Sequence, residues 1–255
     1  MEKYRQLFYE FVNLSNQEKF LVDNLADIVS ESQSMNFSVE GTDIESLKQA
    51  AAEGDSNAQL ELATLYADGD GVPQDAVLAA HWFSKSAHQG NPEAQFALGC
   101  CYMTGEGVEP NSTKAAEWFK KAAEQGDSDA QYNLARCYDI GDGIAQDQKE
   151  AVKWYRAAAE QGDTDALNDL GWCYINGEGV EKDYDEAFRL ISLAYAGNPD
   201  EPDLQHSMGY CLYYGIGTTA DQEQGLHLFK TSAEGGCKEA LDELDKHKKN
   251  KQSTI

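Results

Sequence analysis

The chain has 255 residues, and 45 acidic against 20 basic residues give it a formal net charge of −25 at pH 7. Charge of this sign repels nucleic acid and anionic membrane surfaces, and it attracts a basic protein partner. No stretch is apolar over the roughly 18 residues that a membrane span needs, and acids interrupt the N-terminal segment where a signal peptide needs an apolar core. We therefore expect a cytoplasmic protein that binds no nucleic acid and does not insert into a membrane.

Residues 1–40 contain no internal repeat. Ser15 and Glu18 have the spacing of a capping box, which predicts the start of a helix. Two hypotheses stay open for this segment: it is a helical cap on the first repeat, or it is a separate docking element. Residues 41–54 predict one further helix, equivalent to the second half of a repeat.

A turn-rich heptapeptide recurs through the rest of the chain. It reads GDGVPQD from Gly69, and related copies begin at Gly105, Gly141 and Gly177 at intervals of 36 residues, with a degraded copy at Gly215 after 38. Self-similarity at a fixed period of this length indicates a repeat architecture. The five repeats are expected at residues 55–90, 91–126, 127–162, 163–198 and 203–236.

One repeat, residues 127–162, predicts a helical hairpin. Its first helix, helix A, ends at Gly141, because glycine adopts a left-handed cap without strain, and Gly143 permits a second turn. Asp147 then caps helix B, and Glu150 completes a capping box. Apolar residues at helical spacing predict the buried stripes: Ala130, Leu134, Cys137 and Tyr138 on helix A, and Ala151, Trp154, Tyr155, Ala158 and Ala159 on helix B.

Small residues occupy one further position of helix A in every repeat. They predict that a second helix approaches closely at that point: Ala63, Gly99, Ala135, Gly171 and Gly209.

The connector does not fit a ligand-binding loop. A calcium loop that started at Asp68 would place Val72 at its fifth position, where an oxygen ligand is needed. A phosphate loop needs a preceding strand and a Lys-Ser or Lys-Thr pair, which are absent from the sequence around it.

This pattern resembles the Sel-one-like repeat family, a 36-residue relative of the tetratricopeptide repeat. The motif A-x-x-x-L-G-x-x-Y, then G-x-G-V-x-x-D, then A-x-x-W-[FY]-x-x-A-A-x-x-G matches four copies closely. The fifth copy departs from it at Leu212, Thr218 and Leu228. The resemblance implies an all-α fold, a right-handed α/α solenoid of about five 36-residue helical hairpins with capping helices. It also implies a protein-binding scaffold. Residues 237–255 are expected to form a C-terminal capping helix and a basic tail.

Four cysteines occupy one equivalent position in successive repeats: Cys101, Cys137, Cys173 and Cys211. Equivalent points on stacked helices lie about 8–10 Å apart or more, whereas a disulfide needs Cα atoms within about 7 Å. We expect free, buried thiols that form neither a disulfide nor a metal site. Cys100 and Cys237 lie outside this column and are expected to be more exposed.

The sequence shows no constellation of residues that a reaction would need. The histidines lack metal-ligand spacing, and surface positions explain His81 and His88. We expect no enzyme activity, no cofactor, no metal and no small-molecule substrate.

The face of helix A beside the constant stripe varies between repeats, which favours a binding surface over packing. In the resembled family helix A lines the concave side, so the variable residues are expected to contact the partner: Phe96, Tyr132, Arg136, Trp172, His206, Tyr210 and Tyr213. The alternative is that they pack adjacent A helices.

Three functions remain open from the sequence pattern alone. The favoured one is a scaffold or adaptor with a protein segment, preferably a basic one, in the groove. The second is an immunity or inhibitor protein that neutralises a bacterial toxin. The third is a peptide-clamp co-chaperone, which needs several basic residues in the groove, where only Arg136 is found.

Overall fold

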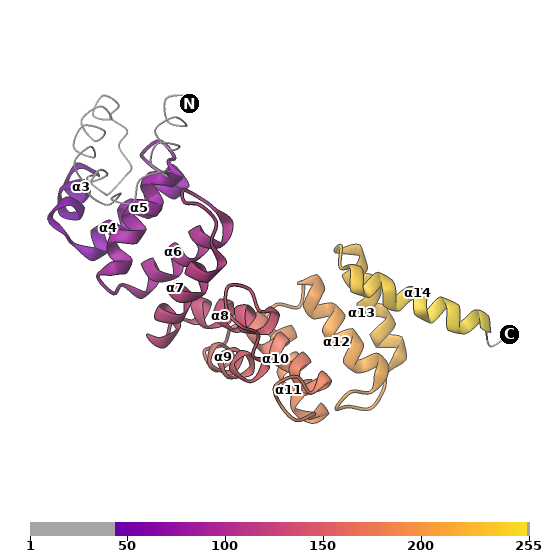
Figure 1. Cartoon of the computed structure of the whole chain (residues 1–255). Coiled ribbons are helices and arrows are strands. Elements are labelled where there is room, and N and C mark those ends of the chain that lie inside the picture. Colours follow the sequence, from indigo (N-terminus) through magenta and orange to yellow (C-terminus); the bar gives the residue numbers. More distant parts are fainter. Residues whose placement is uncertain (1–43, 254–255) are drawn as a thin grey trace. The chain divides into compact units, whose positions relative to one another are not determined.

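The computed structural model describes residues 44–253. The chain divides into two units, Met1–Ile44 and Glu45–Ile255, and the helices described below belong to the second unit apart from the first residue of α3. The two hypotheses for residues 1–40 concern a segment outside the described residues. Within the described part every regular element is an α-helix (Figure 1).

The described residues form twelve helices. One helix precedes the first repeat, namely α3 (Ile44–Glu53), and one comes after the last, namely α14 (Lys238–Ser253). The A helices are α4 (Ser56–Asp68), α6 (Pro92–Thr104), α8 (Ser128–Ile140), α10 (Thr164–Asn176) and α12 (Pro202–Tyr214). The B helices are α5 (Ala76–His88), α7 (Ser112–Glu124), α9 (Gln148–Glu160), α11 (Tyr184–Gly197) and α13 (Gln222–Glu234).

The principal helix contacts join neighbours in sequence. Each helix A packs on helix B of its own repeat, and each helix B packs on helix A of the next. The buried residues form clusters that continue from one repeat to the next, and one of them extends from Ala135 on α8 to Leu204 on α12. This arrangement confirms the all-α solenoid, in which the core lies between repeats.

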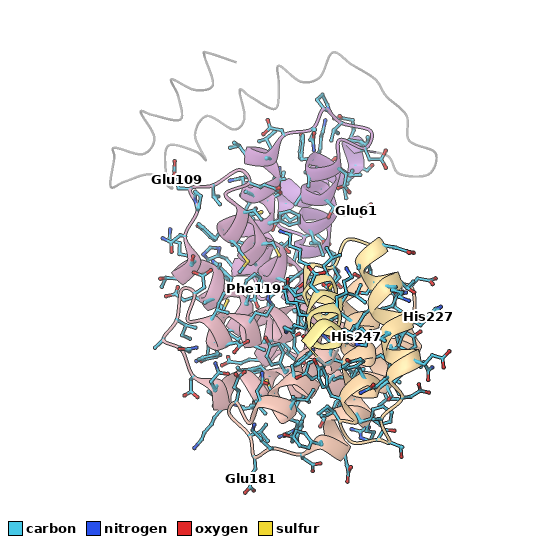
Figure 2. The ribbon with its side chains drawn as sticks, turned by 90° about the vertical axis from the view of Figure 1, so that its right-hand side faces the viewer. Glu61, Glu109, Phe119, Glu181, His227 and His247 are labelled. Atoms are coloured by element: carbon cyan, nitrogen blue, oxygen red, sulfur yellow. The ribbon has the colours of Figure 1, made fainter. Side chains whose placement is uncertain are left out.

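Helix A and helix B approach closely where helix A has a small residue, as predicted. A Cβ atom built on Gly99 would lie 2.6 Å from Cε1 of Phe119, and one on Gly171 would lie 2.7 Å from Cγ1 of Ile191. Phe119 is fully buried, and Figure 2 shows it within the helical part of the chain. The position therefore admits the large side chain of helix B because helix A has no side chain there.

The two glycines of the connector have different roles. Gly141 ends α8 in the left-handed conformation, with φ of 75°, and its N–H donates to the carbonyl of Cys137 at 2.9 Å. Gly143 also has a positive φ of 73°, but a Cβ there would collide with the carbonyl of Ser112, the first residue of α7. The second glycine therefore lets the connector contact helix B of the preceding repeat.

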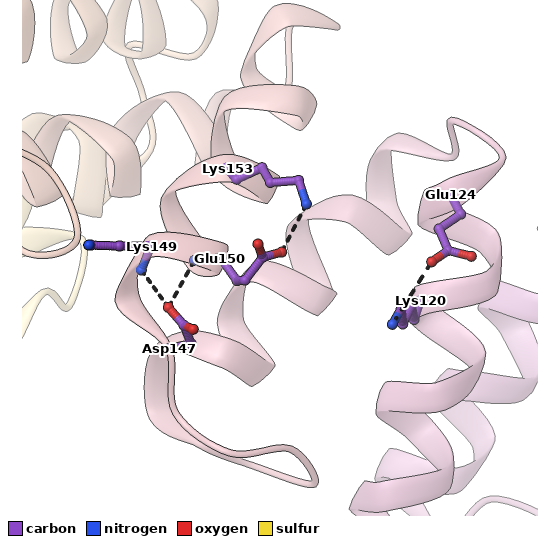
Figure 3. Close-up of polar contacts among 6 residues, drawn as sticks. All are labelled: Lys120, Glu124, Asp147, Lys149, Glu150 and Lys153. Atoms are coloured by element: carbon purple, nitrogen blue, oxygen red, sulfur yellow. Dashed lines mark hydrogen bonds and ion pairs between the residues drawn. The ribbon is translucent and has the colours of Figure 1, made fainter.

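The N-terminal caps of the B helices are confirmed, but the reciprocal half of the capping box is wrong. Asp147 accepts hydrogen bonds from the N–H groups of Lys149 and Glu150 at 3.0 and 3.2 Å (Figure 3). Glu150 instead pairs with Lys153 at 3.0 Å. The reason is that the N–H of Asp147 already donates to the carbonyl of Tyr138 at 2.9 Å, so it needs no second acceptor.

A column of glutamines links successive B helices through helix A, and it was not predicted. Gln131 of α8 donates to the carbonyl of Ala123 at the end of α7 and accepts from Gln161 after α9, at 3.2 and 2.9 Å. Gln59 and Gln95 make the equivalent bonds in the first two repeats. In the fourth repeat Leu167 occupies the position, so the column ends at α10.

The contact between Gly99 and Phe119 predicts that Gly99→Ala changes the free energy of unfolding in one direction when the Phe119 ring is present and in the other when it is absent. Alanine in a helix is intrinsically about 1 kcal/mol more favourable than glycine, but overpacking a core costs about 1–3 kcal/mol. Gly99→Ala should therefore destabilise the wild-type chain and stabilise a Phe119→Val variant, in which the ring is gone. Chemical denaturation of the wild type, the two single variants and the double variant measures both effects. If the effects of the two substitutions on stability simply add in the double variant, the packing described here is contradicted.

Candidate functional site

Two adjoining hollows lie on the A helices of repeats three to five. The first has a volume of about 440 Å³ and lies among α8, α10 and the start of α12. The second has a volume of about 290 Å³ and lies between α8 and α10, with α9 contributing Tyr155. Asp169 of α10 lines both. We call the two hollows together the A-face groove.

Helical spacing brings side chains from two repeats into this groove. Tyr132 and Arg136 lie one turn apart on α8, and Asn168 and Trp172 occupy the equivalent positions of α10. The hydroxyl of Tyr132 donates to Oδ2 of Asp169 at 3.3 Å. One repeat thus contacts the next through polar side chains of the A helices at the groove.

The groove is strongly acidic. Six carboxylates and one guanidinium line it: Asp139, Asp165, Asp169, Glu178, Glu201 and Asp203, and Arg136. Asp165 and Asp203 lie in first helical turns, where the helix dipole favours a negative charge. Among the described residues, none of the six forms an ion pair with a lysine or arginine.

Asp169 is a carboxylate that the fold does not explain. It lies in the middle of α10, and the equivalent residues are Glu61, Ala97, Asn133 and Ser207, so the repeat does not require an acid there. Burial raises the pKa of Asp169 to about 6, although the hydrogen bond from Tyr132 and the charge of Arg136 lower it. Asp169 was not among the predicted site residues, because only the neighbouring positions were compared between repeats.

Beside Asp169, Asn168 adds an acceptor without a partner among the described residues. Its side-chain oxygen Oδ1 is buried and has no hydrogen-bond partner within the part of the chain that the structure describes. The residue lines the first hollow. A buried acceptor without a donor costs about 1–3 kcal/mol, and a ligand could supply the donor only if the amide turned toward the hollow.

Trp172 has a packing role in addition to its position in the second hollow. Its Nε1 donates to Oγ of Ser207 at 2.9 Å, and its ring lies 4.9 Å from Tyr210 and stacks 6.0 Å from His206. Trp172 therefore joins α10 to α12, which is the alternative that the sequence left open. We consequently expect Trp172→Ala to lower stability. A loss of binding in this variant would therefore not distinguish an effect on the binding surface from an effect on folding.

Three of the seven predicted binding residues line the groove, namely Tyr132, Arg136 and Trp172. The other four do not line either hollow: Phe96, His206, Tyr210 and Tyr213. Phe96 packs on Phe119, with ring centroids 5.8 Å apart. Tyr213 hydrogen-bonds Nδ1 of His247 on α14 at 2.8 Å, and Figure 2 labels this histidine. Tyr213 of the fifth repeat therefore helps to hold the C-terminal helix.

The described cysteines are free thiols, as predicted. Burial raises the pKa of Cys101 and Cys137 to about 11, and that of Cys173 and Cys211 to about 12. All four are therefore protonated at neutral pH and are poor nucleophiles.

Cys237 is buried, which corrects the expectation that it is more exposed than the column. Its Sγ, a carboxylate oxygen of Asp203 and one of Glu239 lie within 4.8 Å of one another. Metals bind the thiolate, but burial raises the pKa of Cys237, and its Sγ donates to Oε2 of Glu239 at 3.5 Å. The geometry therefore favours a hydrogen-bonded thiol over a metal ligand.

His81 is a second correction, because it is half-buried and not a surface residue. Its ring meets that of Trp82 edge-on at 5.5 Å, and burial lowers its pKa to about 4. His88 is exposed, as expected.

The fold defines a class of protein, the α-solenoid built from helical-hairpin repeats. The Sel1 repeat family matches the chain at residues 56–91, 92–127, 128–163, 164–199 and 202–237. The chain belongs to the Sel1 repeat family, which confirms the resemblance seen in the sequence. Repeat folds of this kind typically mediate protein–protein interactions. In the described part, no helix has the length and apolar character to cross a membrane.

Solved structures agree with this assignment. A Sel1 repeat protein from Oxalobacter formigenes is 33% identical with a TM-score of 0.69, over 78% of this chain and 81% of that one. The protein c5321, a protective antigen of uropathogenic Escherichia coli, is 32% identical with a TM-score of 0.63, over 78% of this chain. This chain spans 50% of the length of c5321.

A more distant structure supports the fold alone. YrrB, a TPR protein with an unusual peptide-binding site, is 20% identical with a TM-score of 0.54, over 79% of this chain and 99% of that one. A search of the curated proteins finds no match.

The raised pKa of Asp169 predicts a pH-dependent effect on stability. An acid with a higher pKa in the folded than in the unfolded chain lowers stability as pH rises from about 4 to about 6. Asp169→Asn removes this effect. Relative to wild type, the variant should gain on the order of 1–3 kcal/mol between pH 4 and pH 7.5.

Denaturant titrations at the two pH values measure the difference. The exposed connector acid Asp70 provides a matched control, because Asp70→Asn makes the same chemical change at a carboxylate that is not buried. A gain for Asp169→Asn that is the same at pH 4 and pH 7.5 would contradict the assigned ionisation.

Proposed function

We propose that the protein is a non-catalytic scaffold that binds a segment of another protein in the A-face groove. The observation that carries the proposal is the pair of hollows that share Asp169, whose carboxylate lacks an ion-pair partner among the described residues. Carboxylates without a basic partner on the described repeat surface support binding to a ligand that supplies donors.

The polar lining favours a protein segment over a small molecule. Small-molecule pockets are mostly apolar with a few polar groups, whereas the first hollow is lined mainly by acids, amides and two hydroxyls. The volumes accommodate individual side chains of a partner. An extended segment that places successive side chains in the two hollows fits this arrangement.

The groove's chemistry supports a role without catalysis. Cys173 lines the second hollow and is the strongest nucleophile type there, but it is buried and its pKa of about 12 keeps the thiol protonated. We propose a cytoplasmic location, which is supported by the free thiols of the described residues, since disulfides are rare in reducing compartments.

The other two functions receive less support. A clamp for a peptide carboxylate needs several lysines and arginines, and the six acids of the groove would repel such a ligand. Neutralisation of a toxin is one form that partner binding takes, and the described residues contain no feature that favours it over other partners.

Exposed apolar residues allow a test that separates binding from folding. Ile140 is 65% exposed and lines the second hollow, whereas Leu193 is 48% exposed on α11. Substitutions at exposed sites usually change stability by less than about 0.5 kcal/mol. Ile140→Gln should weaken partner binding at least about fivefold, and Leu193→Gln should leave it unchanged.

Quantitative affinity capture from the native cell, with mass spectrometry of the bound proteins, measures this. Partners retained by Leu193→Gln and depleted in Ile140→Gln would support the groove. Equal capture by the two variants would place the binding surface elsewhere.

A further inference from the structure

We propose that the segment bound in the A-face groove is cationic. A lysine or arginine side chain would lie beside Asp169, and an apolar side chain would lie against Ile140. This inference rests on the proposed function and deepens it by naming the chemistry of the partner.

Charge is the first argument. The groove's carboxylates outnumber its bases by six to one, and among the described residues none of these acids is paired with a base. Helix dipoles account for Asp165 and Asp203, which lie in first turns, and Glu178 belongs to the exposed connector acids. Neither the helix dipole nor the exposed connector accounts for Asp169, because it lies in the middle of a helix.

The hydrogen-bond acceptors of Asn168 and Asp169, which the described residues do not saturate with donors, are the second argument. Oδ1 of the neutral Asn168 is buried without a partner in the described residues, and it lies in the wall that Asp169 shares. The hydroxyl of Tyr132 is the side-chain donor that reaches Asp169. A guanidinium or an ammonium supplies several N–H donors and no acceptor, which matches this pair of residues better than an amide or a carboxylate does.

The second hollow adds an apolar requirement. Ile140 is 65% exposed at its edge, and the partly exposed ring of Trp172 lines it. Because Asp169 also lines this hollow, the cationic and apolar sites adjoin. In the second repeat Phe96 and Ala97 replace the Asn168–Asp169 pair, so the combination is particular to this part of the solenoid.

The ionisation of Asp169 supports the same ligand. Burial raises its pKa to about 6, and a bound cation would lower it again. Affinity for a cationic segment should therefore rise as pH rises from about 5 to about 7.5. The groups that face Asp169 are Tyr132, Arg136 and Asp139 from α8, Tyr155 from α9, Asp165 from α10 itself, and Glu201 and Asp203 at the start of α12.

A peptide titration of the full chain, followed by NMR, tests the inference. The ligand is a nonapeptide of glycine and serine with a central arginine and a leucine three residues later. Its matched control contains citrulline in place of arginine, which keeps the shape and removes the charge. We expect at least tenfold tighter binding of the arginine peptide at pH 7.5, with shifts of the Ile140 methyl and the Trp172 indole N–H signals.

Two variants locate the charge. Asp169→Asn should weaken binding of the arginine peptide at least tenfold and reduce its dependence on pH, whereas Asp70→Asn should leave the affinity unchanged. Equal binding of arginine and citrulline peptides, tighter binding of a glutamate peptide, or no shift with any of them would overturn the inference.

Different results would reject the proposed binding groove and the proposed cationic segment. Partner capture that depends on Ile140 without a preference for arginine rejects only the cationic segment. Partner capture that does not depend on Ile140 rejects the groove as the binding surface.

Discussion

Close contact between a side chain of helix B and a residue of helix A that has little or no side chain is the constraint on which the structure depends. Phe119 fits against Gly99, and Ile191 fits against Gly171, so each helix B is fixed between two A helices. Gly143 adds a third contact by admitting the carbonyl of Ser112. Because a single hairpin cannot bury its own apolar surface, these contacts between neighbours supply the stability of the array.

This arrangement leaves part of helix A outside the principal packing. The B helices supply the principal packing, so the A helices meet one another through side chains such as Tyr132 with Asp169 and Trp172 with Ser207. Where these side chains leave space, the A-face groove forms. The fourth repeat departs most clearly at this surface, since Leu167 interrupts the glutamine column and Asp169 introduces a partly buried carboxylate whose pKa is raised by burial.

The sequence predicted the features that repeat, because each is determined by local chemistry: helix periodicity, left-handed glycine caps, small residues at close contacts and the column of thiols. It predicted the groove less well. Asp169 was missed because it lies one residue beyond the position compared between repeats, and its burial depends on Tyr132 of another repeat. The hydrogen bond of Tyr213 to His247 could not be predicted from the sequence, because it depends on how α14 packs. The second half of the capping box failed because its backbone donor already has an acceptor.

The proposed partner occupies the A helices of repeats three to five. Amide hydrogen exchange of the full chain, with and without the captured partner, tests this placement most directly. We expect slower exchange in α8, α10 and the start of α12 when the partner is bound, with little change in α4 and α6. Slower exchange confined to the B helices, or to α4 and α6, would contradict the placement.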